Sequence, residues 1–238
     1  MSIRFAQYRS IVSGNRWLRT VFCLTLCVAS SVAQDSPHAV SVSARRSYVT
    51  SSKLFYQPET SNPDLELKGL TGYGLDLRYP ISSADLSLSL SVDYVSAVSE
   101  RSRVLNLEGT PRRYTVREGI DFIPIELSVL AYIPVGLSPF RLSMSGGFGT
   151  YLAKHLLTVD GVDAEALLSN GAYGIHIDLG FEYQFWERVS ARANVRFRDP
   201  DITVESHFTD RFSPAQFRSR VNVNGMAVSL GVMVRLFE

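Results

Sequence analysis

The stretch from Tyr173 to Arg198, YGIHIDLGFEYQFWERVSARANVRFR, decides the fold of this chain. Apolar and polar residues alternate along it, and the only interruption is Trp186-Glu187-Arg188. Successive side chains of a strand point to opposite faces of a sheet. The stretch therefore predicts two strands joined by a tight turn, with one apolar and one charged face. The apolar face consists of Tyr173, Ile175, Ile177, Leu179, Phe181, Tyr183 and Phe185, then Val189, Ala191, Ala193, Val195 and Phe197.

The same alternation recurs along most of the chain. We expect six further strands, at about residues 39–50, 70–81, 85–107, 120–135, 140–152 and 226–236. Short connections follow the second, fourth and sixth strands. Long polar segments follow the others, at about 51–67, 158–171 and 199–220, and we expect residues 112–118 to be a water-exposed arm. This pattern favours an antiparallel up-and-down topology, with the tight turns on one rim and the long loops on the other.

Composition leaves several classes of protein open and excludes a few. The chain has 238 residues, 45% of them hydrophobic, and a formal net charge of +1. A near-neutral chain gives no reason to expect a nucleic acid as partner. The mean hydropathy of +0.04 resembles that of a soluble protein. A membrane-spanning β-barrel has the same average, because its strands alternate between apolar and polar residues.

The N-terminal segment predicts an export signal. Its basic start carries four arginines and no acid: Arg4, Arg9, Arg16 and Arg19. A short apolar core at 21–28 and the small residues Ser31-Val32-Ala33 follow, which places cleavage after Ala33. We therefore expect a signal peptide at 1–33 and one barrel domain at 34–238. Both cysteines, Cys23 and Cys27, lie in the signal, so the exported chain is not a disulfide-stabilised scaffold.

Two features favour a membrane-spanning barrel over a soluble one with its apolar face inside. Aromatic residues gather at the turn ends of the strands and predict an interfacial girdle, which consists of Tyr79, Tyr132, Tyr183, Phe185 and Trp186. The polar face combines small residues with charges of both signs, which suits a narrow interior where charges pair. The predicted interior network consists of Asp76, Arg78, Asp93, Glu126, Arg141, His176, Asp178, Glu182, Arg192, Arg196 and Arg235.

An open sheet edge in lipid would leave backbone groups without hydrogen bonds, so the strands must close into a ring. We predict an all-β fold, an eight-stranded antiparallel up-and-down transmembrane β-barrel preceded by a cleaved signal peptide. The chain resembles the small eight-stranded bacterial outer-membrane barrels, namely the OmpA-type transmembrane domain and the related "outer membrane protein beta-barrel" domain. The resemblance rests on the signal peptide, the turn and loop pattern, the strand FIPIEL at 122–127 and the alternating last strand. It implies an outer-membrane location and insertion by the barrel-assembly machinery.

The sequence contains little evidence of chemistry. His176 and Asp178 share a face with serines on other strands, which leaves a lipid hydrolase as an alternative. Arg192, Arg196 and Arg198 could line a narrow anion channel, although an eight-stranded interior is just wide enough for its own side chains. No histidine has metal-ligand spacing, and we expect neither a metal nor a cofactor. A secreted, soluble ligand-binding barrel is the remaining alternative.

The predicted function is therefore that of an integral outer-membrane protein with a structural or surface-binding role. We expect its long extracellular loops to carry that role, because binding residues concentrate on loops held by a rigid scaffold. Expected partners are outer-membrane lipid and lipopolysaccharide, which Arg112, Arg113 and Arg117 near a loop tip could contact, and an extracellular ligand. We expect a monomer without enzymatic activity and without a nucleic-acid partner.

Overall fold

The structure, a computed structural model, describes residues 40–55, 65–81, 86–106, 111–133, 139–166, 171–208, 216–223 and 225–236. The predicted signal peptide lies outside these residues. Among the residues described, no helix is long and apolar enough to cross a membrane. The described chain forms strands β1 (Ser41–Phe55), β2 (Leu65–Pro80), β3 (Leu86–Leu105), β4 (Arg112–Ile133), β5 (Phe140–Val159), β6 (Val162–Asp163), β7 (Glu165–Ala166), β8 (Ala172–Gln184), β9 (Val189–Arg198), β10 (Asp201–His207), β11 (Gln216–Asn222) and β12 (Gly225–Arg235).

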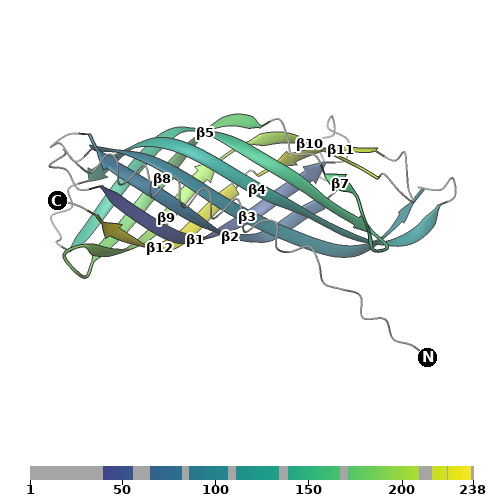
Figure 1. Cartoon of the computed structure of the whole chain (residues 1–238), viewed down its shortest axis with the longest axis horizontal. Helices are drawn as coiled ribbons and strands as arrows, with labels where there is room; N and C mark the ends of the chain where they lie inside the picture. Colours follow the sequence, from purple (N-terminus) through teal and green to yellow (C-terminus); the bar gives the residue numbers. More distant parts are fainter. Residues whose placement is uncertain are drawn as a thin grey trace, which may run out of the picture.

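Eight antiparallel strands close into a ring in the order β1, β2, β3, β4, β5, β8, β9 and β12. The ring closes because β12 returns to pair with β1, from Ser41 opposite Arg235 to Val49 opposite Ala227. Figure 1 shows the resulting elongated barrel with strongly tilted strands. The predicted eight-stranded up-and-down barrel is confirmed. Its short-turn rim carries the connections after β2, β4 and β8, and its long-loop rim carries those after β1, β3, β5 and β10.

The segment 199–220, whose composition predicts a polar loop, mostly consists of strands. β10 and β11 pair with each other from Asp201 opposite Asn222 to His207 opposite Gln216. β11 continues the course of β12 along β1, with Leu54 opposite Val221, and β10 leads on from the end of β9. In Figure 1 both strands lie at the end of the barrel away from the chain's C-terminus. The hairpin therefore lengthens the barrel wall beyond the long-loop rim of the ring.

The wall is also extended by β3, β4 and β5. Residues 112–118, expected as a returning water-exposed arm, begin β4 and return along β3, with Arg112 opposite Leu105. Arg113 and Arg117 are exposed, but the other face of this arm is not. Tyr114, Val116 and Glu118 are buried there. β5 runs on to Val159, and Asp160 and Gly161 turn the chain into β6 with positive φ angles of 47° and 80°. A two-residue hairpin turn of this kind needs positive φ at both positions, which Asp and Gly tolerate.

The alternation places apolar side chains outside and polar side chains inside the ring. Ile175 is 77% and Leu179 48% exposed, whereas Asp76 and Arg78 are almost completely buried. The inward positions shift in the first hairpin, between Val49 and Ser52 in β1 and between Leu70 and Leu67 in β2. Gly69, with a φ of 69°, lies at this shift, where an L side chain would be strained. Beyond it, the interior lining changes from polar to mainly apolar residues.

We predict that Leu179→Arg lowers the free energy of unfolding. Leu179 lies on the outward face of β8, between Tyr173 and Tyr183, where lipid would surround it. An arginine near the middle of a bilayer costs about 2–4 kcal/mol in a β-barrel. Urea titration of the protein refolded in lipid vesicles would measure the loss. Ser102→Arg, on the exposed part of β3, is the matched control and should change stability little; an equal loss in both variants would contradict the assignment of the lipid face.

Candidate functional site

The inward-facing polar side chains of the ring fill its interior. We call the buried ionisable set the lumen network, which consists of Arg45, Asp76, Arg78, Asp93, Glu126, His176, Asp178, Glu182, Arg192, Arg196 and Arg198. Five carboxylates and five guanidinium groups make it formally neutral when His176 is neutral. Burying charges requires such pairing, because each unpaired ion carries a large desolvation penalty.

Asp76 of β2 is one centre of the lumen network. Its carboxylate lies 3.3 Å from Nε of Arg78, and Nη1 of Arg192 on β9 donates to it across the lumen. The Ser89 hydroxyl on β3 also donates to Asp76, and Nη1 of Arg45 on β1 lies 4.0 Å away. Four strands therefore converge on a single carboxylate.

Arg196 of β9 is the second centre. Its Nη2 lies 2.6 Å from Asp178 and its Nη1 donates to Glu126 on β4. Arg198 connects the same region, with Nη1 3.5 Å from Glu126 and Nη2 3.4 Å from Asp93. Nε of Arg45 donates to Asp93 over 2.9 Å, which links this centre to the Asp76 centre.

Two residues at the short-turn end of the lumen, Arg141 and Tyr132, lie elsewhere than the sequence predicted. Arg141 is exposed, with its guanidinium 5.8 Å from the centre of the Tyr132 ring, so it lies outside the buried network. Tyr132 faces inward instead of joining the girdle: its hydroxyl accepts from Nη1 of Arg78 over 2.8 Å and donates to Glu182 over 3.4 Å. Arg235 lies at the margin of the network, 3.8 Å from Glu182, with 20% of its side chain exposed.

The other predicted girdle residues lie on the outer surface near the short turns. Tyr183, Phe185 and Trp186 are exposed, and Tyr79 is half-buried. The rings of Phe185 and Trp186 lie 5.0 Å apart. A second set of outward-facing tyrosines, not predicted from the sequence, lies toward the opposite end of the apolar band. It comprises Tyr48, Tyr73 and Tyr173, which are all exposed.

His176 contacts Ser128 and Glu126, and not Asp178, the residue with which the hydrolase alternative grouped it. Its Nε2 lies 2.7 Å from the Ser128 hydroxyl, and its Nδ1 lies 4.0 Å from Glu126. Asp178 accepts from the amide of Asn194 over 2.7 Å. The contacts of His176 therefore bring together a serine, a histidine and a glutamate, but the three side chains are almost completely buried. The serine hydroxyl is therefore enclosed within the lumen network.

A second buried serine, histidine and glutamate set lies beyond the ring. Nδ1 of His155 on β5 lies 3.2 Å from the Ser206 hydroxyl on β10. Nε2 of His155 lies 3.7 Å from Glu118 on β4, and the three residues are at most 1% exposed. Sequence reasoning missed this set, because Ser206 lies in a segment whose composition predicts a loop. Its contacts tie β4 and β5 to β10.

Apolar side chains close the lumen on the long-loop side of the lumen network. This apolar plug consists of Val49, Leu54, Leu67, Leu70, Val95, Ile120, Phe122, Tyr151, Ala153, Ile202, Val204, Val221, Val223 and Ala227, all at most 3% exposed. The rings of Phe122 and Tyr151 stack with centroids 5.8 Å apart. The Tyr151 hydroxyl donates to Glu126 over 3.2 Å, and the guanidinium of Arg198 lies over the Phe122 ring. The plug and the network are therefore in direct contact.

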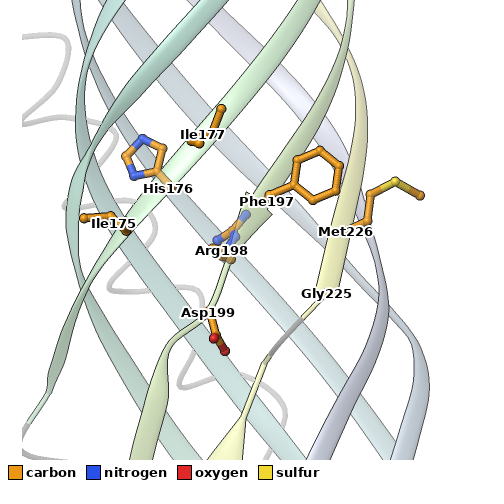
Figure 2. Close-up of a pocket in the computed structure, with 8 residues that line it drawn as sticks. All are labelled: Ile175, His176, Ile177, Phe197, Arg198, Asp199, Gly225 and Met226. Atoms are coloured by element: carbon orange, nitrogen blue, oxygen red, sulfur yellow. The ribbon is translucent and has the colours of Figure 1, made fainter.

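A hollow of about 450 Å³ lies in the wall where β9 ends and β12 begins. Figure 2 shows the residues that line it, which are Ile175, His176, Ile177, Phe197, Arg198, Asp199, Gly225 and Met226. Its apolar members have the outward parity, whereas His176 and Arg198 are buried in the lumen network. Among the described residues, no group of three or more histidine, cysteine or acidic side chains could hold a metal ion.

Comparison with solved structures identifies the fold. The outer membrane protein OprG from Pseudomonas aeruginosa is 14% identical, with 84% of this chain and 97% of that chain covered and a TM-score of 0.55. A major outer membrane protein from Thermus thermophilus is 13% identical, with 84% and 100% covered and a TM-score of 0.53. No protein-family model and no curated protein matches the sequence. The fold is that of the small outer-membrane β-barrels, as the sequence predicted.

We predict that Asp76→Asn destabilises the barrel. Asp76 is the common partner of Arg78, Arg192 and Arg45. Its neutralisation takes the paired carboxylate from buried Arg192, whereas Arg45 keeps Asp93 and Arg78 keeps Glu182. Breaking one side of a buried ion pair costs about 3–5 kcal/mol. Urea unfolding in lipid vesicles, followed by tryptophan fluorescence, would measure the change.

The control for this variant is Glu205→Gln. Glu205 lies 3.6 Å from Arg218 in an exposed pair, and such pairs contribute about 1 kcal/mol or less. If Asp76→Asn proved as mild as the control, the lumen network would contribute little to the stability of the barrel.

Proposed function

We propose that this chain is an integral protein of the bacterial outer membrane that binds an external ligand through the extensions of its wall beyond the long-loop rim. The observation that carries the membrane location is the outer surface of the ring. Large apolar side chains such as Leu88, Met144, Ile177 and Leu230 are exposed there, while charged side chains are buried inside. A protein surrounded by water would lose stability with its faces arranged in this way.

The filled interior favours a barrel that acts as a rigid scaffold for its wall extensions over one that acts as a channel. The lumen network cross-links the ring strands through paired charges, and the apolar plug follows it along the barrel axis. An eight-stranded barrel has an interior just wide enough to be filled by side chains. Small ions crossing it would have to break buried ion pairs and then pass an apolar layer.

The binding surface in this proposal is the ribbon that β3 and β4 form beyond the ring. We call residues 98–105 of β3 and 112–118 of β4 the basic ribbon. Arg113 and Arg117 are exposed on β4, opposite Val104 and Glu100 of β3. Within the described part of the chain, no carboxylate forms an ion pair with either arginine. Both guanidinium groups are therefore available to an anionic ligand.

The chemistry of the basic ribbon favours an anionic polysaccharide, such as the phosphorylated sugars of lipopolysaccharide. Guanidinium groups bind phosphate and carboxylate with two parallel hydrogen bonds. A paired ribbon also holds these groups in place before binding, which lowers the ordering cost that a flexible loop would have. Neither buried set of serine, histidine and glutamate supports the alternative of a lipid hydrolase, because both are enclosed.

We predict that the barrel does not conduct ions. The protein purified from outer membranes would be inserted into planar lipid bilayers and its current recorded under applied voltage. We expect no stepwise conductance, because the lumen network and the apolar plug fill the interior. A general porin in the same bilayer would serve as a positive control. Steady open-channel steps from the chain itself would favour the narrow channel over the closed support.

We predict that the double variant Arg113→Gln, Arg117→Gln weakens binding to an anionic polysaccharide. The measurement is the salt concentration that elutes the folded protein from an immobilised polyanion. We expect the variant to elute at clearly lower salt, because two ion contacts and their counterion release are lost.

The matched control is Arg218→Gln, which removes an exposed arginine that already pairs with Glu205. It should elute close to the unmodified protein. If the double variant and the control were indistinguishable, the basic ribbon would not be the binding surface.

A further inference from the structure

Arg46 interrupts the apolar outer face of the first hairpin. It follows Val42 and Ala44 on the outward side of β1 and is exposed, opposite Tyr73 of β2 and Leu230 of β12. Its guanidinium lies 5.9 Å from the centre of the Tyr73 ring. Tyr48, the next outward residue, is also exposed. A cation thus lies on the lipid-facing surface, flanked by two tyrosines.

This cation has no counter-charge within the described part of the protein. Among the residues that the structure describes, no carboxylate forms an ion pair with Arg46. A charge on the lipid face of a barrel is costly at mid-membrane and is tolerated near the interface. A cation at this position therefore calls for an anionic group supplied from outside the chain.

The surroundings place Arg46 at the border of the apolar band nearer the long-loop rim. Toward that rim, the exposed residues on the outer surface of the hairpin are polar, among them Thr71, Lys68, Glu66 and Lys53. Lys53 and Lys68 are brought to the outside by the shift of inward positions at Gly69. Lys68 lies 3.8 Å from Glu66, which is the sole acid among these residues. Together with Arg46, the surface carries a net positive charge.

We infer that this surface, the hairpin patch of Arg46, Tyr48, Lys53, Lys68 and Tyr73, binds the phosphate groups of one lipid A molecule. Arg46 binds one phosphate beside the two tyrosine hydroxyls, where the apolar band meets the headgroups. Lys53 and Lys68 supply positive charge for a second phosphate farther from the membrane centre. The acyl chains lie against the apolar residues next to Arg46, such as Ala44, Leu75 and Leu230.

Two arguments select lipid A as the occupant. The patch is continuous with the surface that the proposed function places in lipid, so the inference rests on that proposal. Its cations are also separated along the strands, with Arg46 on one side of the Gly69 shift and the two lysines on the other. A ligand with two separated phosphates matches this arrangement, whereas a phospholipid such as phosphatidylglycerol has a single headgroup phosphate. Charge-assisted hydrogen bonds from arginine to phosphate are among the strong ones in proteins.

The test is a titration of the full-length protein, purified from outer membranes in mild detergent, with defined lipids and native mass spectrometry as the readout. The probes are bisphosphorylated lipid A, monophosphorylated lipid A and phosphatidylglycerol. We expect one tightly bound bisphosphorylated lipid A per chain, with weaker binding of the other two. Equal binding of phosphatidylglycerol would overturn lipid A as the occupant.

The variants locate the site. We expect Arg46→Gln to weaken binding of bisphosphorylated lipid A about tenfold, the effect of losing one charge-assisted interaction. The variant keeps its fold because it removes a lipid-facing charge, and its heat-dependent mobility on a denaturing gel would verify this. The double variant Lys53→Gln, Lys68→Gln should lose the preference for two phosphates over one. Unchanged lipid A affinity in Arg46→Gln would overturn the site, and an unchanged preference in the double variant would overturn the role of the lysines.

The control Arg113→Gln, Arg117→Gln separates this inference from the proposed function. That variant should bind lipid A normally while losing retention on the polyanion, and Arg46→Gln should do the reverse. Absence of the chain from outer-membrane fractions would contradict the proposed function itself. Presence there without any lipid A binding would contradict the hairpin patch alone.

Discussion

The closure of β1 onto β12 is the constraint on which the rest of the structure depends. With lipid outside, a strand edge has no water to satisfy its N–H and C=O groups, so every ring strand needs two neighbours. The pairing from Ser41 opposite Arg235 to Val49 opposite Ala227 removes the last two edges. Closure then fixes the faces, because side chains that do not point to lipid must point into a narrow shared interior. The lumen network and the apolar plug are two different ways of filling that interior.

The lumen network and the apolar plug stabilise two parts of the barrel by different interactions. In the ring, arginines and carboxylates from strands far apart in sequence neutralise one another, as Arg192 and Asp76 do across the lumen. Toward the long-loop rim, apolar side chains such as Val95 and Val204 pack as they would in a soluble protein. Arg198 and Tyr151 join the two, since each contacts both Glu126 and the Phe122 ring. A closed wall with a filled interior leaves the outer face and the wall extensions as the surfaces available for binding.

Much of this fold could be predicted from alternation alone. The ring strands around Leu179 and Val232 alternate without a break, because one face meets lipid and the other meets charges. The β10 strand was missed although Ile202 and Val204 alternate with polar neighbours, because it is short and lies among charged residues. Tyr132 was misplaced because it was assigned by its aromatic ring, whereas its parity is that of Glu126 and Ser128. Arg141 has the inward parity, but it lies next to the short-turn rim, where the barrel opens to solvent.

Contacts across the lumen lay beyond prediction from one sequence. Alternation shows that His176 and Ser128 both face inward, but not that they are 2.7 Å apart. Their contact depends on the register of every pair of neighbouring strands around the ring. A single sequence does not specify that register directly. Arg45 was likewise missing from the predicted network. Its parity with Ser41 and Ser43 placed it inside, but its partner Asp93 lies on β3, two strands away.

The pairing of β1 with β12 also constrains how the barrel folds. Neighbours such as β8 and β9 are joined by a tight turn and can pair as soon as both exist, whereas β1 and β12 stand near opposite ends of the described chain. Pairings between distant segments have a high loop-closure cost and form late. Until they form, the first and last strands expose unpaired backbone groups, which are a template for pairing with other chains. During assembly, β1 and β12 therefore need protection from other chains until they pair with each other. This requirement follows from the topology, because the strands that close the ring lie far apart in the sequence.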